Sequence, residues 1–189
     1  MELGGRELRA GHIAVLPIWF DSLGAKSACT LIRTPDVRIL VDPGAASMQP
    51  SFPLPGPEKE RLKLEAYRAI ERAAKKADVI VITHYHYDHH VRFDFPIDAK
   101  AVYSSKLVLA KDPNSYINKS QWERARLLYA QMCDELGRLD LGEVLIKPGE
   151  RGYPNPMRSL PLASAKDFGL SLIHISEPTR PRLISYAVF

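Results

Sequence analysis

The sequence contains only two cysteines, Cys29 and Cys133, and neither has a CxxC partner. We expect both to be small core residues in a reducing compartment. No apolar run approaches the roughly 20 residues that a membrane-spanning helix needs. The N-terminal residues mix acidic and basic side chains and lead into no apolar signal core. The sequence therefore predicts a cytoplasmic protein with no membrane partner.

The sequence also has no strong excess of charge of one sign, since its 189 residues include 26 Lys and Arg and 22 Asp and Glu. With 46% hydrophobic residues, this balance excludes a disordered chain. The 11 glycines and 15 prolines follow no period, which excludes collagen-like and low-complexity classes. Acidic and basic residues are interspersed, so the positive balance permits nucleic-acid contact without arguing for it. The length is that of one domain.

Hydrophobic periodicity predicts strands and helices in a layered α/β domain. Four prolines lie within residues 45–57, which predicts a long irregular loop. Pro17 suggests that the first long strand is an edge strand or a strand end. Ser120 and Glu123 have the spacing of a helix capping box. We expect strands at 13–20, 28–32, 37–41, 79–82 and 101–103, and helices at 58–77 and 120–136.

Four of the six histidines lie between His84 and His90, directly after the apolar run 79–82. Residues i and i+2 of an extended segment point to the same side, so His84 and His86 project together. A turn after them lets Asp88 and His89 point into the same space. Imidazole and carboxylate donors without thiolate suit zinc, manganese or iron. The alternative is a surface cluster of histidines without a metal.

The run His84–His89 matches the HxHxDH signature of the metallo-β-lactamase superfamily. Upstream, residues 41–44 resemble the apolar strand, Asp, x, Gly element of that superfamily. More narrowly, the chain resembles an uncharacterised, mainly archaeal family of predicted metal-dependent hydrolases. The matching pieces are residues 22–24, 39–44, 83–90, 117–121 and 123–125. The resemblance covers about residues 13–136.

The resemblance implies an αββα sandwich of metallo-β-lactamase type, with a metal site at the strand ends between its sheets. His84 and His86 would bind a first metal, and Asp88 and His89 a second. Asp42 would sit behind these ligands and orient an imidazole through its ring N–H, since a carboxylate partner fixes the tautomer. Without the resemblance, Asp42 is equally well a turn-forming residue.

His90 lies one residue past the signature. We expect it to support the ligands from behind or to be exposed. A shift of the signature by one residue is the remaining alternative.

The implied cofactor is a pair of divalent metals, zinc by preference, with manganese and iron as alternatives. A water bound to such metals has its pKa lowered to about 7 and supplies hydroxide at neutral pH. The expected enzyme is a metal-dependent hydrolase that acts on an ester, lactone, thioester or phosphodiester bond. Asp88 would be its catalytic residue, because it can both bind metal and orient the nucleophile. The alternatives are a nuclease of the same superfamily and a non-catalytic metal-binding protein.

The downstream ligands of the superfamily, which are two further histidines and a bridging aspartate, are missing. No histidine occurs between residues 91 and 169, and the aspartates there follow no bridging pattern. We therefore expect only the N-terminal portion of the sandwich. The chain as it stands is expected to be inactive, because its ligands are too few for two complete sites.

Residues 170–189 resemble the translation of a transposase-type sequencing-library adapter. Leu170–Arg180 matches the transposon end with its extension, and Ile184–Phe189 matches the flow-cell end. We therefore expect two units: a truncated hydrolase domain over residues 1–169, and a non-native tail over residues 170–189. The alternative is a native C-terminal strand.

Overall fold

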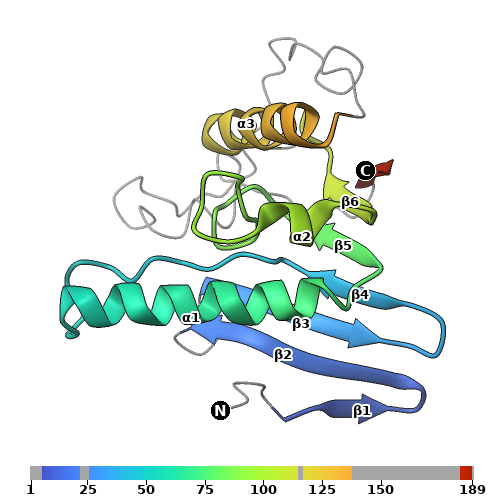
Figure 1. The fold of residues 1–189 in the computed structure, drawn as a ribbon, viewed down its shortest axis with the longest axis horizontal. Coiled ribbons are helices and arrows are strands. Elements are labelled where there is room, and N and C mark those ends of the chain that lie inside the picture. Colours follow the sequence, from blue (N-terminus) through green and yellow to red (C-terminus); the bar gives the residue numbers. More distant parts are fainter. Residues whose placement is uncertain (1–5, 22–25, 115–116, 138–183, 189) are drawn as a thin grey trace, which may run out of the picture.

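The computed structural model describes residues 6–21, 26–114, 117–137 and 184–188, the last by its backbone alone. Seven strands form one mixed sheet in which the strand order follows the sequence order (Figure 1). The strands are β1 Leu8–Ala10, β2 Ile13–Asp21, β3 Lys26–Arg33, β4 Arg38–Val41, β5 Val79–Ile82, β6 Leu107–Lys111 and β7 Ile184–Val188. The α/β class expected from the sequence is confirmed.

The sheet is mixed, with a parallel centre and antiparallel pairings on both sides. Strands β1 to β4 are joined by antiparallel pairings, whereas β4, β5 and β6 run parallel to one another. In the register, Val41 pairs with Val81, and Ile82 pairs with Ala110. The carboxyl ends of the three parallel strands therefore meet at one edge of the sheet, which is the usual place for a functional site in such sheets.

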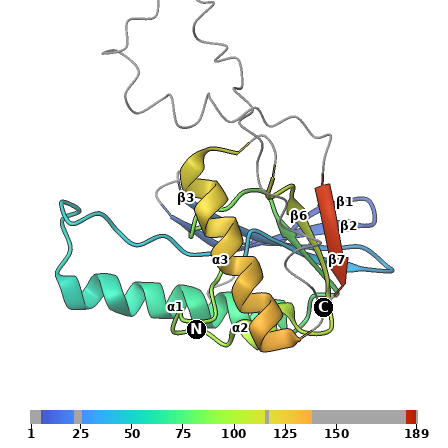
Figure 2. The same ribbon diagram turned by 90° about the horizontal axis from the view of Figure 1, so that it is seen from above.

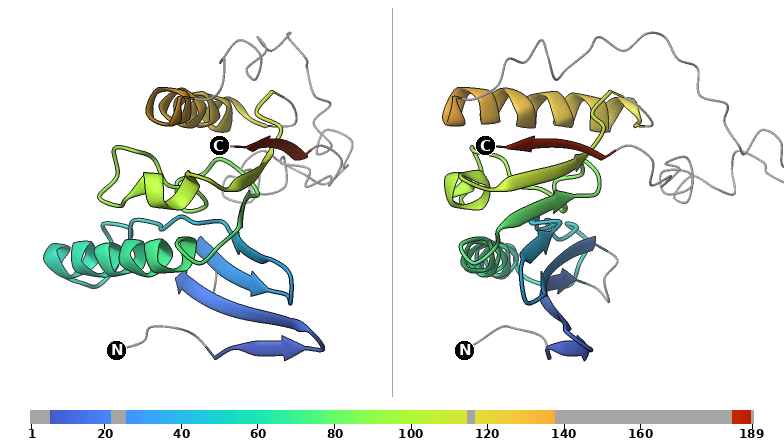
Figure 3. Two further views of the ribbon diagram at one scale, coloured as in Figure 1. Left: turned by 45° about the vertical axis from the view of Figure 1, so that its right-hand side comes forward. Right: turned by 90° about the vertical axis from the view of Figure 1, so that its right-hand side faces the viewer.

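Three helices complete the described fold: α1 Gly56–Ala74, α2 Ala99–Tyr103 and α3 Lys119–Leu136. Helices α1 and α2 lie on the same face of the sheet (Figure 3). The buried side of α1 carries small and apolar residues at helical spacing, including Ala66, Ile70 and Ala73. Its other side carries ion pairs such as that of Arg61 with Glu65. No helix among the described residues is both long and apolar enough to span a membrane.

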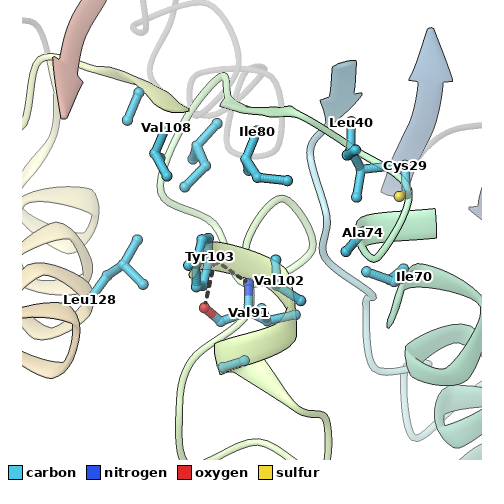
Figure 4. Packing of buried hydrophobic residues seen from close by; sticks show 14 of the residues in the cluster. Cys29, Leu40, Ile70, Ala74, Ile80, Val91, Val102, Tyr103, Val108 and Leu128 are labelled. Carbon is cyan, nitrogen blue, oxygen red and sulfur yellow. Dashed lines mark hydrogen bonds between the residues drawn. The ribbon is translucent and has the colours of Figure 1, made fainter. Parts of the chain in front are cut away.

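Alternate residues of the central strands form the core beneath the helices. Leu40, Ile80 and Val108 of β4, β5 and β6 are at most 3% exposed and pack with Val102 and Leu128 (Figure 4). Their neighbours in sequence on these strands point to the opposite face and are only partly buried. The sheet therefore has one face covered by helices and one apolar face that is only half covered. This is the arrangement of one half of a layered sandwich.

The expectation that the strand at 13–20 is an edge strand is wrong. Strand β2 lies between β1 and β3, and its register shifts between Pro17 and Trp19. A proline has no N–H to give to a ladder, and a bulge is one of the few interior positions that tolerate this. The pattern of the sequence showed the proline but not the bulge.

The strand expected at 101–103 is also wrong, because these residues belong to helix α2. The side chain of Asp98 accepts a hydrogen bond from Ala101 N and so caps the helix start. The extended strand comes four residues later, as β6. A short apolar run has no periodicity of its own, so the cap decided its conformation.

The ends of the two long helices differ from expectation. Helix α1 ends at Ala74 rather than Ala77. The N-cap of α3 is Asn118, whose side-chain oxygen accepts from Gln121 N at 2.9 Å, so the capping box at Ser120 and Glu123 is not formed. Gly137 ends α3 with a φ of 67°, a left-handed conformation that glycine adopts without strain.

Most of the residues 170–189 lie outside the described residues. The exception is β7, whose backbone pairs antiparallel with β6 at the end of the sheet (Figure 2).

Candidate metal centre

The signature residues lie at the edge where the parallel strands end. Asp42 follows the last residue of β4, and Thr83 begins the loop that follows β5. Asp42 N donates to Val81 O at 2.8 Å, so the parallel pairing continues one step beyond the strand. The backbone at Asp42 then turns into the left-handed region, with a φ of 50°. This turn lets the Asp42 side chain reach the loop after β5.

Asp42 joins the two loops through its carboxylate. Its Oδ1 accepts from Thr83 N at 2.8 Å, and its Oδ2 accepts from Thr83 Oγ1 at 2.8 Å. The same Oδ2 accepts from His89 Nδ1 at 2.9 Å. The residue is 4% exposed, so these contacts form where water screens them little. The carboxylate therefore orients one imidazole directly.

A second imidazole is oriented through Thr83. The Thr83 hydroxyl gives its proton to Asp42, so it can only accept from the Nδ1 of His84, which lies 3.0 Å away. This requires the proton of neutral His84 to be on Nδ1 and leaves the lone pair on Nε2. Sequence reasoning missed Thr83, although its position next to the first histidine was visible in the printed motif.

Three imidazoles come together in this loop. The ring centroids of His84 and His89 lie 3.7 Å apart, and those of His84 and His86 lie 4.8 Å apart. The histidines of the two ligand pairs inferred from the resemblance, His84 with His86 and Asp88 with His89, are therefore one group, with the His84 ring next to both others. Nevertheless, no three His, Cys, Asp or Glu side chains in the described parts of the chain are placed to hold one ion.

Asp88 lies beside this group. Its Oδ2 is 3.4 Å from His89 Nε2 and 3.4 Å from Ser27 N, at the start of β3. Burial by itself would raise the pKa of Asp88, but the hydrogen bond and charge of His89 and two backbone N–H groups hold it well below the usual range. Asp88 is therefore a carboxylate at neutral pH. Sequence reasoning missed Ser27, which has no signal in the sequence.

The histidines have different charges. Burial would lower the pKa of His89, but its hydrogen bonds to Asp42 and Asp88 raise it to about 9. Burial, with the neighbouring His89 and His86, lowers the pKa of His84 to about 4. At pH 7 the metal-free group therefore holds a protonated His89 between two carboxylates and a neutral His84 beside it.

His90 is fully buried, so it is not an exposed residue. Its Nδ1 donates to His86 O at 2.9 Å, and burial lowers its pKa to about 3. Its Nε2 is buried without a hydrogen-bond partner. The rings of Tyr85 and Tyr87 lie against it. His90 thus supports the backbone of the loop at His86 and faces away from solvent.

Buried side chains hold the loop at both ends. Tyr85 is fully buried, its hydroxyl donates to Lys111 O, and its backbone N donates to Gln121 Oε1 at 3.2 Å. Tyr103 of α2 accepts from Val91 N and donates to Val91 O. The histidines therefore lie on a loop that β6, α2 and α3 all anchor, which favours a fixed geometry.

The raised pKa of His89 makes the stability of the metal-free protein depend on pH. Its ordinary pKa is near 6.5 and its folded value is about 9, so its stabilisation is complete below pH 6.5 and is lost as the pH rises through 9. In the presence of EDTA, we expect the free energy of unfolding to fall by up to about 3 kcal/mol between pH 6.5 and pH 9.5. Urea denaturation at several pH values measures this.

The matched control is His89→Asn, which keeps a polar side chain that does not titrate. Its unfolding free energy should be flat over the same interval. An equal decline in both proteins would mean that another group is responsible.

The donor chemistry of the group fits a divalent metal, because imidazole nitrogen and carboxylate oxygen suit zinc, manganese or iron. Histidines that bind metals commonly give their other ring N–H to a carboxylate, and the hydrogen bond between His89 and Asp42 has this form. The described residues bring together His84, His86, Asp88 and His89, with Asp42 and His90 behind them. They supply an incomplete donor set for one ion.

This loop lies within the part of the chain that is similar to known proteins. Residues 24–90 match the family model described as Metallo-beta-lactamase superfamily. The chain is 44% identical over 150 residues to a UPF0282 protein of Methanopyrus kandleri, which covers 70% of this chain and 51% of that protein. A UPF0282 protein of Korarchaeum cryptofilum is 44% identical over 119 residues, covering 62% and 39%.

A UPF0282 protein of Sulfurisphaera tokodaii is 46% identical over 132 residues, covering 68% of this chain and 42% of that protein. The chain thus spans about half the length of the curated relatives it matches, or less. No solved structure matches. These relatives bear out the resemblance to an uncharacterised archaeal family, and their names specify no activity.

Proposed function

We propose, from the relationship of this chain to the metallo-beta-lactamase superfamily and the archaeal UPF0282 proteins, that the complete protein is a metal-dependent hydrolase. The observation that carries the proposal is the gathering of three imidazoles and Asp88 where β5 ends, with Asp42 behind His89. Substrates of the proposed reaction carry an ester, lactone, thioester or phosphodiester bond.

His84 and His86 would hold one metal, and Asp88 and His89 a second, for which zinc is the first choice. When bound, the metals supply Lewis acidity that brings the ionisation of water close to neutral pH. Asp42 keeps the proton of His89 on Nδ1, and Thr83 keeps that of His84 on Nδ1, so each presents Nε2 as a ligand. Because His89 is protonated in the metal-free protein, metal binding must release that proton and should strengthen toward pH 9.

Asp88 is the proposed catalytic residue. Its lowered pKa keeps it ionised, so it accepts a hydrogen bond from the attacking water and fixes the direction of attack. Ser27 N holds one oxygen of the carboxylate and limits its rotation. Orientation of this kind is a large part of what a positioned carboxylate contributes to catalysis.

The first test removes the proposed ligands. In the double variant His84→Ala, His86→Ala, we expect zinc affinity to fall by more than about 100-fold, since loss of a ligand costs more than loss of its hydrogen-bond partner, which costs about 10–100-fold. Competition with a chromophoric chelator measures the affinity.

His12→Ala is the matched control, because His12 is an exposed histidine at the turn between β1 and β2. Its zinc affinity should equal that of the parent chain. Loss of zinc in the control, or retention in the double variant, would contradict the assignment of the ligands.

A non-catalytic metal-binding protein is the second candidate. The observation that favours it is the incomplete donor set among the described residues. A panel of p-nitrophenyl esters, a lactone, a thioester and bis-p-nitrophenyl phosphate, assayed with zinc and with manganese, separates the two. Turnover that depends on Asp88 supports the hydrolase, and stoichiometric metal without turnover of the complete protein supports the alternative.

We further propose that residues 170–189 are adapter-derived and that the domain continues past Gly169. We expect sequencing of the source DNA across codon 169, with primers outside the suspected adapter, to give an open frame that supplies His, then Asp, then His. A frame that ends with this tail would contradict the proposal. The non-catalytic candidate would then be the better one.

A further inference from the structure

A cavity of about 630 Å³ lies beside the candidate metal centre, between the β2–β3 strand pair, the loop after β4 and the start of α1. We call it the α1 pocket. Its lining includes Trp19, Phe20, Lys26, Phe52, Lys59 and Lys63. The volume lies within the range of about 300–1,000 Å³ that small-molecule sites have.

The α1 pocket and the metal centre share a wall. Lys26 and Ala46 line the pocket, and Ser27 between them touches the centre. Ser27 Oγ accepts from Ala46 N at 2.7 Å, and Ser27 N lies 3.4 Å from Asp88 Oδ2. The charge of Asp88 also reaches the pocket, where it contributes, after burial, to raising the pKa of Asp21. Asp88 therefore lies behind the wall of the pocket, and Ser27 links the two.

Large apolar side chains of the pocket are open to solvent. Phe20 is 45% exposed and Phe52 is 44% exposed, and they come from β2 and from the loop after β4. Leaving two such rings half in water is unfavourable, and an apolar ligand that covers them would remove this cost. Trp19 and Leu62 add to the apolar wall.

The polar part of the lining is positively charged. Lys26, Lys59 and Lys63 face a single carboxylate, that of Asp21. Lys59 Nζ donates to two backbone carbonyls, Gln49 O and Pro50 O, each at 2.9 Å, and Lys63 Nζ donates to Ser47 Oγ at 2.8 Å. These acceptors are neutral. The charge of Lys26 interacts with Asp21. Among the described residues, neither Lys59 nor Lys63 has an ion-pair partner, so their charge is available to an anion.

We propose that the α1 pocket binds the substrate of the metal centre, and that this substrate is an amphipathic anion with an acyl or aromatic body and a carboxylate. The apolar body would lie against Phe20 and Phe52, and the carboxylate against Lys59 and Lys63. The inference rests on the proposed function for the role of substrate, but the binding itself does not require metal. Of the substrate classes left open above, it favours acyl esters, lactones or thioesters that carry a carboxylate.

Intrinsic fluorescence can report on the pocket. The chain has two tryptophans, and Trp19 lines the pocket whereas Trp122 lies on α3. In a Trp122→Phe background, Trp19 is therefore the sole reporter. The probes are octanoate, octanamide and octylammonium, which share an apolar chain and differ in charge. Titrations are done with EDTA and repeated with zinc.

We expect saturable binding of octanoate at least about 10-fold tighter than that of octanamide, and weakest binding of octylammonium. The double substitution Lys59→Met, Lys63→Met should bring octanoate and octanamide to similar affinities. Lys76→Met, an exposed lysine just beyond the end of α1, should leave the preference unchanged. Phe52→Ser should weaken octanoate and octanamide alike.

Equal affinity for all three probes, or no saturable response, would overturn the proposal. If the double lysine variant does not fold, the single variants Lys59→Met and Lys63→Met give the same decision, because each removes one of the two charges proposed to hold the carboxylate. The two proposals fail separately. If the parent chain takes up zinc but does not bind octanoate, only the proposal for the pocket is contradicted. If it binds octanoate but does not take up zinc, only the proposal for the metal centre is contradicted.

Discussion

Replacing Asp42 by alanine should destabilise the chain by about 3–5 kcal/mol, the range found when one partner of a buried charged pair is removed. The variant loses three hydrogen bonds to a residue that is 4% exposed, and it leaves the raised-pKa imidazole of His89 without its closest carboxylate. Urea denaturation near pH 7 in EDTA measures the loss. Asp36→Ala is the matched control, since Asp36 is exposed in the turn between β3 and β4, and we expect it to change stability by less than about 0.5 kcal/mol.

Asp42→Asn separates the two roles of this residue. The amide oxygen can still accept from Thr83 N, so the variant should retain much of the stability that alanine loses. Its NH₂ group would face His89 Nδ1, which must then accept, so the ring proton moves to Nε2, the atom proposed to bind metal. We expect zinc affinity to fall about 10–100-fold. Parent-like zinc affinity in a folded Asn variant would mean that Asp42 is structural only.

Gly44→Ala should have an effect of similar size through steric contact alone. A Cβ at this position would lie 2.4 Å from Asp88 C, 2.4 Å from His89 N and 2.6 Å from His90 N. All three are backbone atoms, so no side chain can rotate away, and the whole loop 83–90 must move. We expect a loss of about 3 kcal/mol or more, at the upper end of what overpacking costs, together with weaker zinc binding.

Gly56→Ala is the control for this substitution. A Cβ at Gly56 meets nothing within 4 Å, and the residue begins helix α1. Alanine favours helix more than glycine does, so this variant should be as stable as the parent or slightly more stable. If Gly44→Ala had the same thermal unfolding midpoint as Gly56→Ala, then the backbone at Gly44 would not pack as closely against residues 88–90 as the structure shows.

Backbone strain gathers at the same place as these contacts. Two of the three non-glycine residues with positive φ in the described chain are Ser27 and Asp42, at 54° and 50°. Both lie at the edge where the signature residues meet, and both contact Asp88 or His89. Strained backbone of this kind persists where the surroundings determine it, and functional sites are a common location.

Much of the fold was predictable because its elements are long or strongly patterned. The helix α1 and the buried strand β5 follow directly from the spacing of their apolar residues, and β5 has the expected bounds. The short apolar runs have no periodicity that fixes their conformation. Residues 101–103 became a helix because Asp98 caps them, and the strand β6 was not anticipated at all.

The sequence by itself determined which residues are the candidates for the chemistry of this protein. Histidine and aspartate at the spacing of His84 to His89, directly after a buried strand, define a candidate donor set, because a strand end and a short loop keep them close. The preceding strand and glycine turn at residues 41–44 were visible in the same way. Residues a few positions apart in the sequence stay close in space, whatever the rest of the fold is.

Only the tertiary structure decided how these residues act on one another. Asp42 and His89 are 47 positions apart, and Ser27 and Asp88 are 61 apart. Their contacts exist because β3, β4 and β5 pair with their ends at one edge of the sheet. The protonation of His89, the tautomer of His84 and the α1 pocket all depend on burial and on partners that no local pattern specifies. Electrostatics and cavities arise from packing, and packing is fixed by the whole fold.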